Sequence, residues 1–299
     1  MTDINIERSQ NIKFGVLYGI ISSFSFSMMS VFAKLIGNDL PTSTLIFFRF
    51  GTSLILIAPW ILIDRNFTFK IHQPIRYVIR ILAALLALFS IFHAIKFIPL
   101  VDALLLNNTA PLFVPIIAFI ITGAKTPKKA IWGIVLGFVG VGIILNPGKE
   151  LFSSSASLIA LASGILAALA IVQMRLISKT STTKQMLFYY FLVSTIVSGV
   201  IASLQWKTPE NLIIWFLLLG IGIFGTLYQL FATLSYVTAP VRLMSPLLFL
   251  TVIFGGIFDW IIWKNTPSML IVTGAVLIIL GSIIAIYFGN KHINAEKRS

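Results

Sequence analysis

The sequence predicts an all-α membrane protein in which ten transmembrane helices form two inverted five-helix repeats, with the N and C termini cytoplasmic. Hydrophobic residues make up 58% of the 299-residue chain and charged residues only 10%, which is more apolar than a soluble domain requires. The apolar residues fall into runs of membrane-spanning length, and the later runs repeat the motif layout of the earlier ones. An odd number of helices per repeat places the two repeats in opposite orientations, an arrangement typical of transporters.

Ten apolar runs are each long enough to cross a bilayer as a helix, which requires roughly 17 to 25 residues. The predicted spans cover residues 14–36, 43–63, 75–97, 101–122, 130–146, 155–177, 186–204, 212–236, 240–263 and 268–288. Because the connections are short, we expect function to reside within the bilayer. The boundaries that follow are a cytoplasmic N-tail at 1–13, a first repeat at 14–148, a second repeat at 149–288 and a cytoplasmic C-tail at 289–299.

The basic residues are distributed unevenly across the predicted membrane. With a cytoplasmic N-terminus, fifteen Lys and Arg side chains fall on the cytoplasmic side and five on the other side. Those five are Lys34, Lys96, Lys149, Lys207 and Lys264. This asymmetry follows the positive-inside rule and therefore places both termini in the cytoplasm. The net charge of +13 then reflects topology, and no nucleic-acid partner is expected.

The fifth and tenth spans contain the clearest internal repeat. Each follows a Thr-Pro pair, and Gly133 and Gly140 in the fifth span have the same spacing as Gly274 and Gly281 in the tenth. Glycine at helical spacing lets two helix backbones approach closely in lipid. The repeat predicts two five-helix bundles related by a pseudo-two-fold axis in the membrane plane, with the substrate path between them.

Ionisable groups inside predicted spans are few, and each is a candidate for function because burying charge in hydrocarbon is costly. Arg49 lies too deep in the second span for easy snorkelling, so it is predicted to face the interior and to pair with a carbonyl or a carboxylate. Asp102, which opens the fourth span, is the nearest candidate partner by depth. Such a pair would either hold helices together or contact an anionic substrate group. His93 lies in the last turns of the third span, and Asp259 late in the ninth.

The fourth span is predicted to be broken near mid-membrane. Pro111 cannot donate to the carbonyl of Asn107, which leaves that carbonyl free beside the amides of Asn107 and Asn108. Broken backbone at this depth is tolerated where it lines a cavity or is packed by protein. Both a binding site and a packed kink without ligand contact therefore remain open.

The ninth span contains a corresponding proline interruption. Pro246 frees the carbonyl of Arg242 beside Ser245. Paired interruptions in corresponding spans of two repeats point to a binding site. In the eighth span, Tyr228 and Gln229 adjoin a Gly-Thr pair and could reach a central cavity.

Small residues mark two further helix faces. Ser23, Ser27 and Ser30 share one face of the first span, where cavity lining and helix packing are equally plausible interpretations. In the sixth span, a stripe of small residues that includes Gly164 indicates packing. The chain has no Cys, and its three histidines fall in unrelated places, so neither a metal site nor a cofactor is expected. No catalytic constellation is present, and an enzyme is not expected.

Residues 94–148 contain three distinctive motifs, IPLVDALLL, APLFVP and GFVGVGIILNPG, and weaker ones occur elsewhere as FFRFGTSL, YVTAPVRLMSPLLF and NTPSMLIVTGAVLI. In these motifs the chain resembles the EamA-type proteins of the drug/metabolite transporter superfamily. The resemblance implies a ten-helix carrier in a bacterial inner membrane that moves amino acids, related metabolites or nucleotide-like solutes by alternating access. The third-to-fourth-span segment looks most like the branch for S-adenosylmethionine uptake and similar metabolite exchange.

Members of this family commonly carry a glutamate after the fourth and ninth helices, where this chain has Ala124 and Asn265. The departure is interpreted either as the loss of a gate or coupling contact or as a tolerant change in two loop caps. We favour the second interpretation.

The leading hypothesis is a secondary transporter of a small polar metabolite, an amino acid, an amino-acid derivative or an adenosyl compound, working in the lipid bilayer. Its predicted substrate-binding residues are Arg49, His93, Asp102, Asn107, Asn108, Tyr228, Gln229, Arg242 and Ser245. One alternative is a proton-driven multidrug exporter that uses Asp102 or Asp259. Another is a membrane assembly or lipid-binding protein that transports nothing. The sequence sets no oligomeric state.

Overall fold

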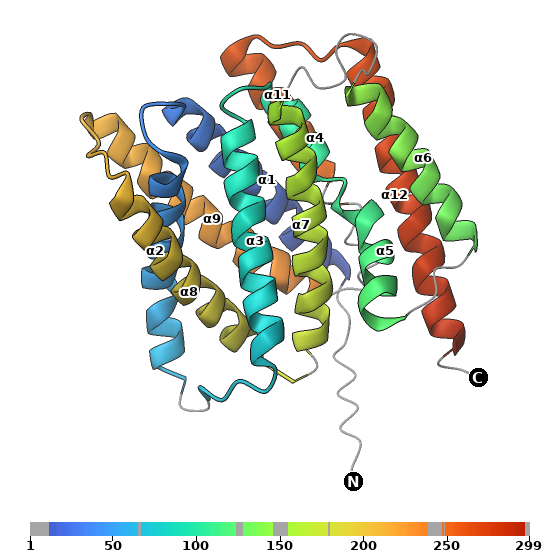
Figure 1. Cartoon of the computed structure of the whole chain (residues 1–299), viewed down its shortest axis with the longest axis horizontal. Coiled ribbons are helices and arrows are strands. Elements are labelled where there is room, and N and C mark those ends of the chain that lie inside the picture. The colour runs from blue at the N-terminus through green and yellow to red at the C-terminus, as the bar shows by residue number, and fades with distance from the viewer. Residues whose placement is uncertain are drawn as a thin grey trace.

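The computed structural model describes residues 12–64, 67–123, 128–145, 155–178, 180–238, 247 and 249–296, and regular structure in these residues is helical (Figure 1). The helices are α1 (Ile12–Ile36), α2 (Thr42–Leu62), α3 (Pro74–Ala94), α4 (Leu100–Asn107), α5 (Ala110–Thr122), α6 (Lys128–Leu145), α7 (Ser155–Ile177), α8 (Thr183–Leu204), α9 (Leu212–Thr238), α11 (Leu250–Trp263) and α12 (Met269–Glu296).

Nine of the predicted spans overlap one of these helices, or the pair α4 and α5 in the case of the fourth span. Of the ninth predicted span, 240–263, the helix α11 covers the part from Leu250 onward, and most of the earlier part lies outside the described residues. Among the residues that the structure describes, seven stretches are long and apolar enough to cross a membrane: α1, α2, α3, α4 with α5, α7, α8 and α9. Shorter apolar segments lie within α6, α11 and α12. The chain is thus a multi-span helical membrane protein, while the count of ten spans and the cytoplasmic placement of the termini stay predictions.

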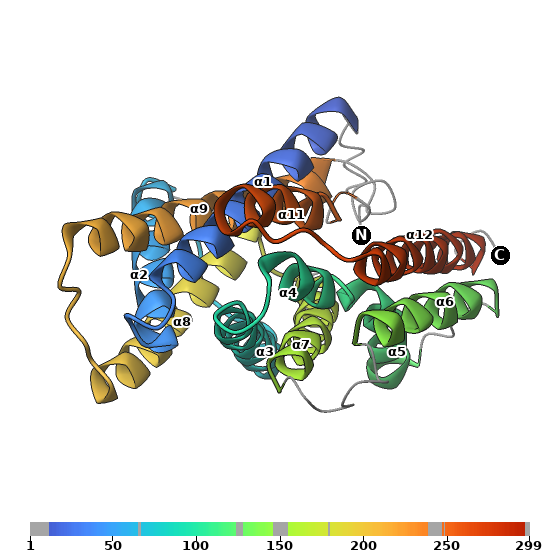
Figure 2. The same cartoon turned by 90° about the horizontal axis from the view of Figure 1, so that it is seen from above.

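The helices pair across the two halves of the chain. The first-half helix α1 packs on α9, and the second-half helix α7 packs on α3 (Figures 1 and 2). The remaining principal pairs are α2 with α8, α6 with α12, and α4 with α11. A pseudo-two-fold axis relates each helix to the helix five spans away in the other half. This exchange turns the pair of α1 with α9 into the pair of α7 with α3, and it turns each of the other three pairs into itself. The halves are not equivalent, because α2 packs on α9 more extensively than α3 packs on α8.

The repeated glycines lie where α6 meets α12, two helices that run side by side in both views (Figures 1 and 2). A Cβ added to Gly140 would lie 2.6 Å from the carbonyl oxygen of Gly274, and one added to Gly281 would lie 2.5 Å from that of Gly133. The late glycine of each helix therefore faces the early glycine of the other, so the helices are antiparallel. An inverted repeat requires this orientation of the fifth and tenth spans.

The serine stripe of α1 packs against the ninth span. Ser23 donates a hydrogen bond to the carbonyl of Leu247, and Ser27 donates one to that of Thr251, both at 2.8 Å. Ser30 donates to the carbonyl of Phe26 in its own helix at 2.9 Å. Of the two interpretations left open by the sequence, the structure supports helix packing.

Candidate functional site

Arg49 forms the centre of what we call the arginine site, together with Gly225, Tyr190, Phe191 and Phe50. Arg49 is 1% exposed, and its Nη2 donates to the carbonyl of Gly225 across a distance of 3.5 Å. The helices α2 and α9 approach this closely because residue 225 lacks a side chain: a Cβ there would lie 3.0 Å from Cγ of Arg49. In the described part of the chain, Nε and Nη1 of Arg49 have no hydrogen-bond partner.

Aromatic rings surround the guanidinium. Its central carbon lies 4.1 Å from the ring centroid of Phe50, 5.5 Å from that of Phe191 and 5.8 Å from that of Tyr190. Tyr228, one of the predicted site residues, packs against Phe26 with the ring centroids 4.7 Å apart and the ring planes tilted. Ring faces attract a cation but leave N–H donors unsatisfied. The site therefore retains donors that an anionic group could accept from.

The predicted pairing of Arg49 with Asp102 is wrong, and the carbonyl alternative is correct. Arg49 sits on α2, which packs on α8 and α9, whereas Asp102 sits on α4, which packs on α7 and α11. Asp102 instead interacts with Asp259 and Lys34. Sequence depth placed the two residues at comparable levels but carried no information on which way each helix faces.

The break in the fourth span is confirmed. The helix α4 ends at Asn107 and α5 begins at Ala110. Asn107 is half-buried and its Nδ2 donates to Oγ of Ser163 on α7 at 2.8 Å, whereas Nδ2 of Asn108 donates to the carbonyl of Leu104 in its own helix. Asn107 thus reaches the second half of the chain, while Asn108 stabilises the end of α4.

The break packs directly on Gly164 of α7, as the small-residue stripe predicted. A Cβ at Gly164 would lie 2.8 Å from the carbonyl oxygen of Leu106 and 3.0 Å from that of Asn107. We expect Gly164→Ala to lower the free energy of unfolding in detergent by about 1–3 kcal/mol, because backbone cannot move aside as a side chain can. Gly199→Ala is the matched control, since its Cβ would meet only the ring of Phe47. Equal stability of the two variants would contradict this packing.

Charged groups gather at the ends of α1, α4 and α11 in what we call the outer ion cluster: Lys34, Asp259, Asp102 and Asn265. Nζ of Lys34 lies 3.2 Å from Oδ1 of Asp259, with side chains 11% and 0% exposed. Asp259 also accepts from the backbone N–H of Val101 and from Nδ2 of Asn265, both at 3.3 Å. Oδ1 of Asp102 is buried and unpartnered within the described residues. The cluster joins α1 and α4 of the first half to α11 of the second.

Sequence reasoning did not select Lys34 and Asp259 as a pair, although a signal existed. In the predicted topology the first and ninth spans run in the same direction, so charges near the ends of both lie at the same depth. Asn265, one of the two departures from the family pattern, belongs to this cluster. Ala124, Arg242 and Ser245 lie outside the described residues.

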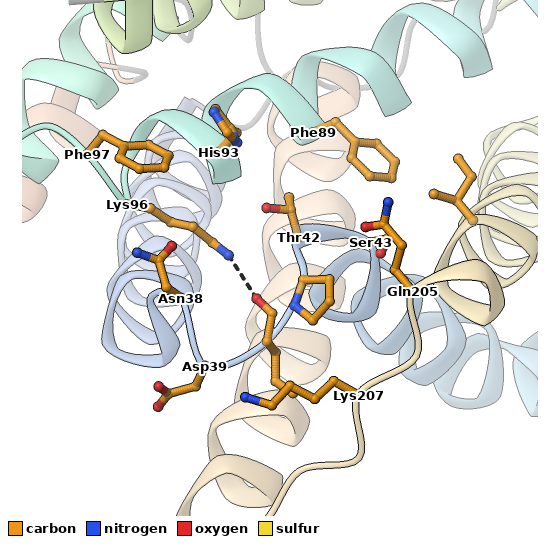
Figure 3. A pocket seen from close by; sticks show the side chains of 13 residues that line it. Asn38, Asp39, Thr42, Ser43, Phe89, His93, Lys96, Phe97, Gln205 and Lys207 are labelled. Carbon is orange, nitrogen blue, oxygen red and sulfur yellow. Dashed lines mark hydrogen bonds between the residues drawn. The ribbon is translucent and has the colours of Figure 1, made fainter.

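Two candidates remain, Gln229 and His93. Gln229 is half-buried on α9, beside Tyr228. His93 is exposed, stacks on Phe97 at 4.9 Å and lines a pocket of about 520 Å³, which we call the rim pocket (Figure 3). First-half residues between Asn38 and Phe97 line this pocket together with Ile201, Gln205 and Lys207 of the second half.

Fold and polar groups together define a multi-span helical membrane protein with buried charge at the seam between two similar halves. Residues 13–146 and 154–287 both match the EamA-like transporter family, and the chain belongs to this family. The resemblance predicted from sequence is therefore confirmed. The family name indicates a transporter rather than an enzyme.

Among relatives, the pseudopaline exporter CntI of Pseudomonas aeruginosa is 28% identical over 91% of this chain and 95% of its own length. The S-adenosylmethionine uptake transporter of Rickettsia conorii is 28% identical over 95% of this chain and 96% of its own length. Human solute carrier family 35 member G1 is 26% identical over 90% of this chain and 78% of its own length. A protein of known crystal structure shares the fold with a TM-score of 0.67, at 18% identity, over 92% of this chain and 98% of that one. The relatives support a transporter of small molecules.

Proposed function

We propose that the chain is a secondary transporter that moves a small polar metabolite across a bacterial inner membrane by alternating access. The path runs between the two repeats, and Arg49 binds an anionic group of the solute. The observation that carries this proposal is the buried guanidinium of Arg49, two of whose nitrogens have no hydrogen-bond partner among the residues that the structure describes. An uncompensated charge inside a membrane protein is costly, so a ligand that supplies the missing acceptor is strongly favoured.

The position of Arg49 suits alternating access. The residue comes from the first half, whereas Gly225, Tyr190 and Phe191 come from the second. A movement of one half against the other changes the surroundings of the guanidinium, which is what a site exposed to each side in turn requires. Relatives named for pseudopaline export and S-adenosylmethionine uptake make metabolites the first solutes to test.

Arg49→Met is expected to raise the half-saturation concentration for solute flux in proteoliposomes by about 10- to 100-fold, since a hydrogen bond to a charged group contributes about 1.5–3 kcal/mol. Labelled S-adenosylmethionine and amino acids are the solutes to measure. Arg49→Lys, which keeps the charge, should retain part of the affinity. Ser53→Ala is the control from the next turn of α2, because its hydroxyl is already bonded to the Arg49 carbonyl and to Thr226.

Folded Arg49→Met protein with unchanged flux and affinity would remove Arg49 from the site. A screen of polar metabolites for thermal stabilisation, followed by flux, tests the broader proposal. The absence of both stabilisation and flux would favour the assembly or lipid-binding alternative.

A buried carboxyl oxygen of Asp102 that has no partner in the described part of the chain gives the multidrug-exporter alternative a specific observation. A proton-driven exporter needs a carboxylate that can gain and lose a proton. Drug resistance that persists in cells carrying Asp102→Asn and Asp259→Asn would remove the proposed coupling groups. Resistance lost in Asp102→Asn alone would favour this alternative.

A further inference from the structure

The rim pocket lies between the two halves of the chain. One side is formed by the α1–α2 connection and the end of α3, and the other by the end of α8 and the residues that follow it (Figure 3). Its volume of about 520 Å³ falls within the roughly 300–1,000 Å³ typical of small-molecule sites. The wall is mixed, with the rings of Phe89 and Phe97 beside hydroxyl, amide and ammonium groups.

Positive charge is concentrated at this pocket. Lys96 and Lys207 line it, and both belong to the five basic residues that the predicted topology places outside the cytoplasm. That side of a membrane protein is generally poor in lysine, so two around one pocket is a local enrichment. Asp39 is the one acidic side chain in its described lining.

Lys96 is held in place and partly removed from water. Its Nζ donates to the carbonyl of Leu40 at 2.9 Å, the bond drawn in Figure 3. Burial lowers the pKa of Lys96, and the neighbouring Asp39 opposes this shift. An anion in the pocket would further stabilise the charged ammonium.

Ser43 provides an independent indication of a ligand. It lines the pocket and is 4% exposed, and its Oγ has no hydrogen-bond partner among the residues that the structure describes. A buried hydroxyl left without a partner is unfavourable, and rotation of the Ser43 side chain toward the pocket would let a ligand acceptor or donor satisfy it. Ser43 lies on the same helix as Arg49, about 9 Å away along the axis at 1.5 Å per residue.

We propose that the rim pocket is a second solute site, at the extracytoplasmic mouth of the path, which binds carboxylate-bearing metabolites through Lys96, Lys207 and Ser43. The place of this pocket on a path to Arg49 rests on the proposed transport function. Binding at the pocket is independent of that function, because the lining residues already lie together in this structure without any movement of the halves.

The absence of Cys from the chain allows a direct test with a single introduced thiol. Gln205→Cys places the thiol in the pocket, and Ser203→Cys places one on a nearby exposed position of α8 as the control. Intact cells are treated with membrane-impermeant anionic and cationic methanethiosulfonates. Relative to the control, the thiol at 205 should react at least about fivefold faster with the anionic than with the cationic reagent. Lys96→Gln combined with Lys207→Gln should abolish this preference.

Ligand binding is then measured as protection of the thiol at 205. Succinate and L-glutamate should slow labelling, whereas succinamide and L-glutamine should not, and the double lysine variant should lose the protection. Protection should be strongest at lower pH and weaken as pH rises through the pKa of Lys96, because the ammonium of Lys96 then loses the charge that attracts the anion.

Equal reaction with both reagents, or no protection by either acid, would overturn the site. Labelling that requires permeabilised cells would overturn the extracytoplasmic assignment. Labelling does not require transport. If the charge preference and the protection are both observed in a protein that shows no flux, the proposed transport function is contradicted, whereas the proposed binding site is supported.

Discussion

Asp259→Leu is expected to lower the free energy of unfolding by about 3–5 kcal/mol, because it leaves the ammonium of Lys34 buried without its carboxylate. Asp259 is fully buried and accepts three hydrogen bonds, from Lys34, Val101 and Asn265, so the loss reaches all three donors. The double variant Lys34→Met with Asp259→Leu should recover much of the lost stability, since neither member of the ion pair is then left without its partner. Chemical unfolding in detergent, arranged as a double-mutant cycle, measures the coupling.

The ion pair between Lys184 and Asp64 is the matched control for this cycle. Its side chains are 26% and 23% exposed, so solvent screens it, and its coupling should be no more than about 1 kcal/mol. Similar coupling energies for the two pairs would contradict the special status of the outer ion cluster. Because that cluster joins the two halves, we also expect the stable double variant to transport with an altered rate.

Gly281→Ala is expected to destabilise the protein by about 1–3 kcal/mol, because the added Cβ would lie 2.5 Å from the Gly133 carbonyl and 2.5 Å from the Gly137 amide nitrogen. The obstructing atoms are backbone, so α6 and α12 must separate along the contact. In lipid, close packing is a main source of helix association, and that separation removes it. Thermal unfolding in detergent provides the measurement.

Gly142→Ala is the control for this second prediction, and the opposite sign is expected. No atom lies within 4 Å of a Cβ at Gly142 among the described residues, so the substitution should stabilise α6 by about 0.5–1 kcal/mol through helix propensity alone. Stabilisation by both substitutions would show that α6 and α12 do not meet at the repeated glycines.

Features that depend on position along one helix were predictable. Span positions follow from hydrocarbon thickness, and the break after Asn107 follows from the donor that Pro111 lacks. Gly133 and Gly274 were recognised as counterparts because close approach in lipid leaves a glycine spacing in the sequence. These features are local, and each has a physical cause that acts within a single segment.

Features that depend on which side of a helix faces its neighbours could not be predicted from the sequence. Arg49 was correctly placed in the interior but assigned to Asp102, whereas it reaches Gly225 and a set of aromatic rings. The functional assignment of Arg49, like that of Asn107, still awaits the experiments above. For Tyr190 the sequence offered no signal, because an aromatic residue in a span is more often core than site.

By itself, the sequence determined the family and the helical membrane fold, because a bilayer constrains the length and the backbone hydrogen bonding of each segment separately. Only the tertiary structure decided that Lys34 meets Asp259, that the serine face of α1 packs on the ninth span, and that residues of both halves line the rim pocket. The physical reason is that hydropathy specifies depth in the membrane, whereas contacts depend on rotation about each helix axis, which packing between helices selects.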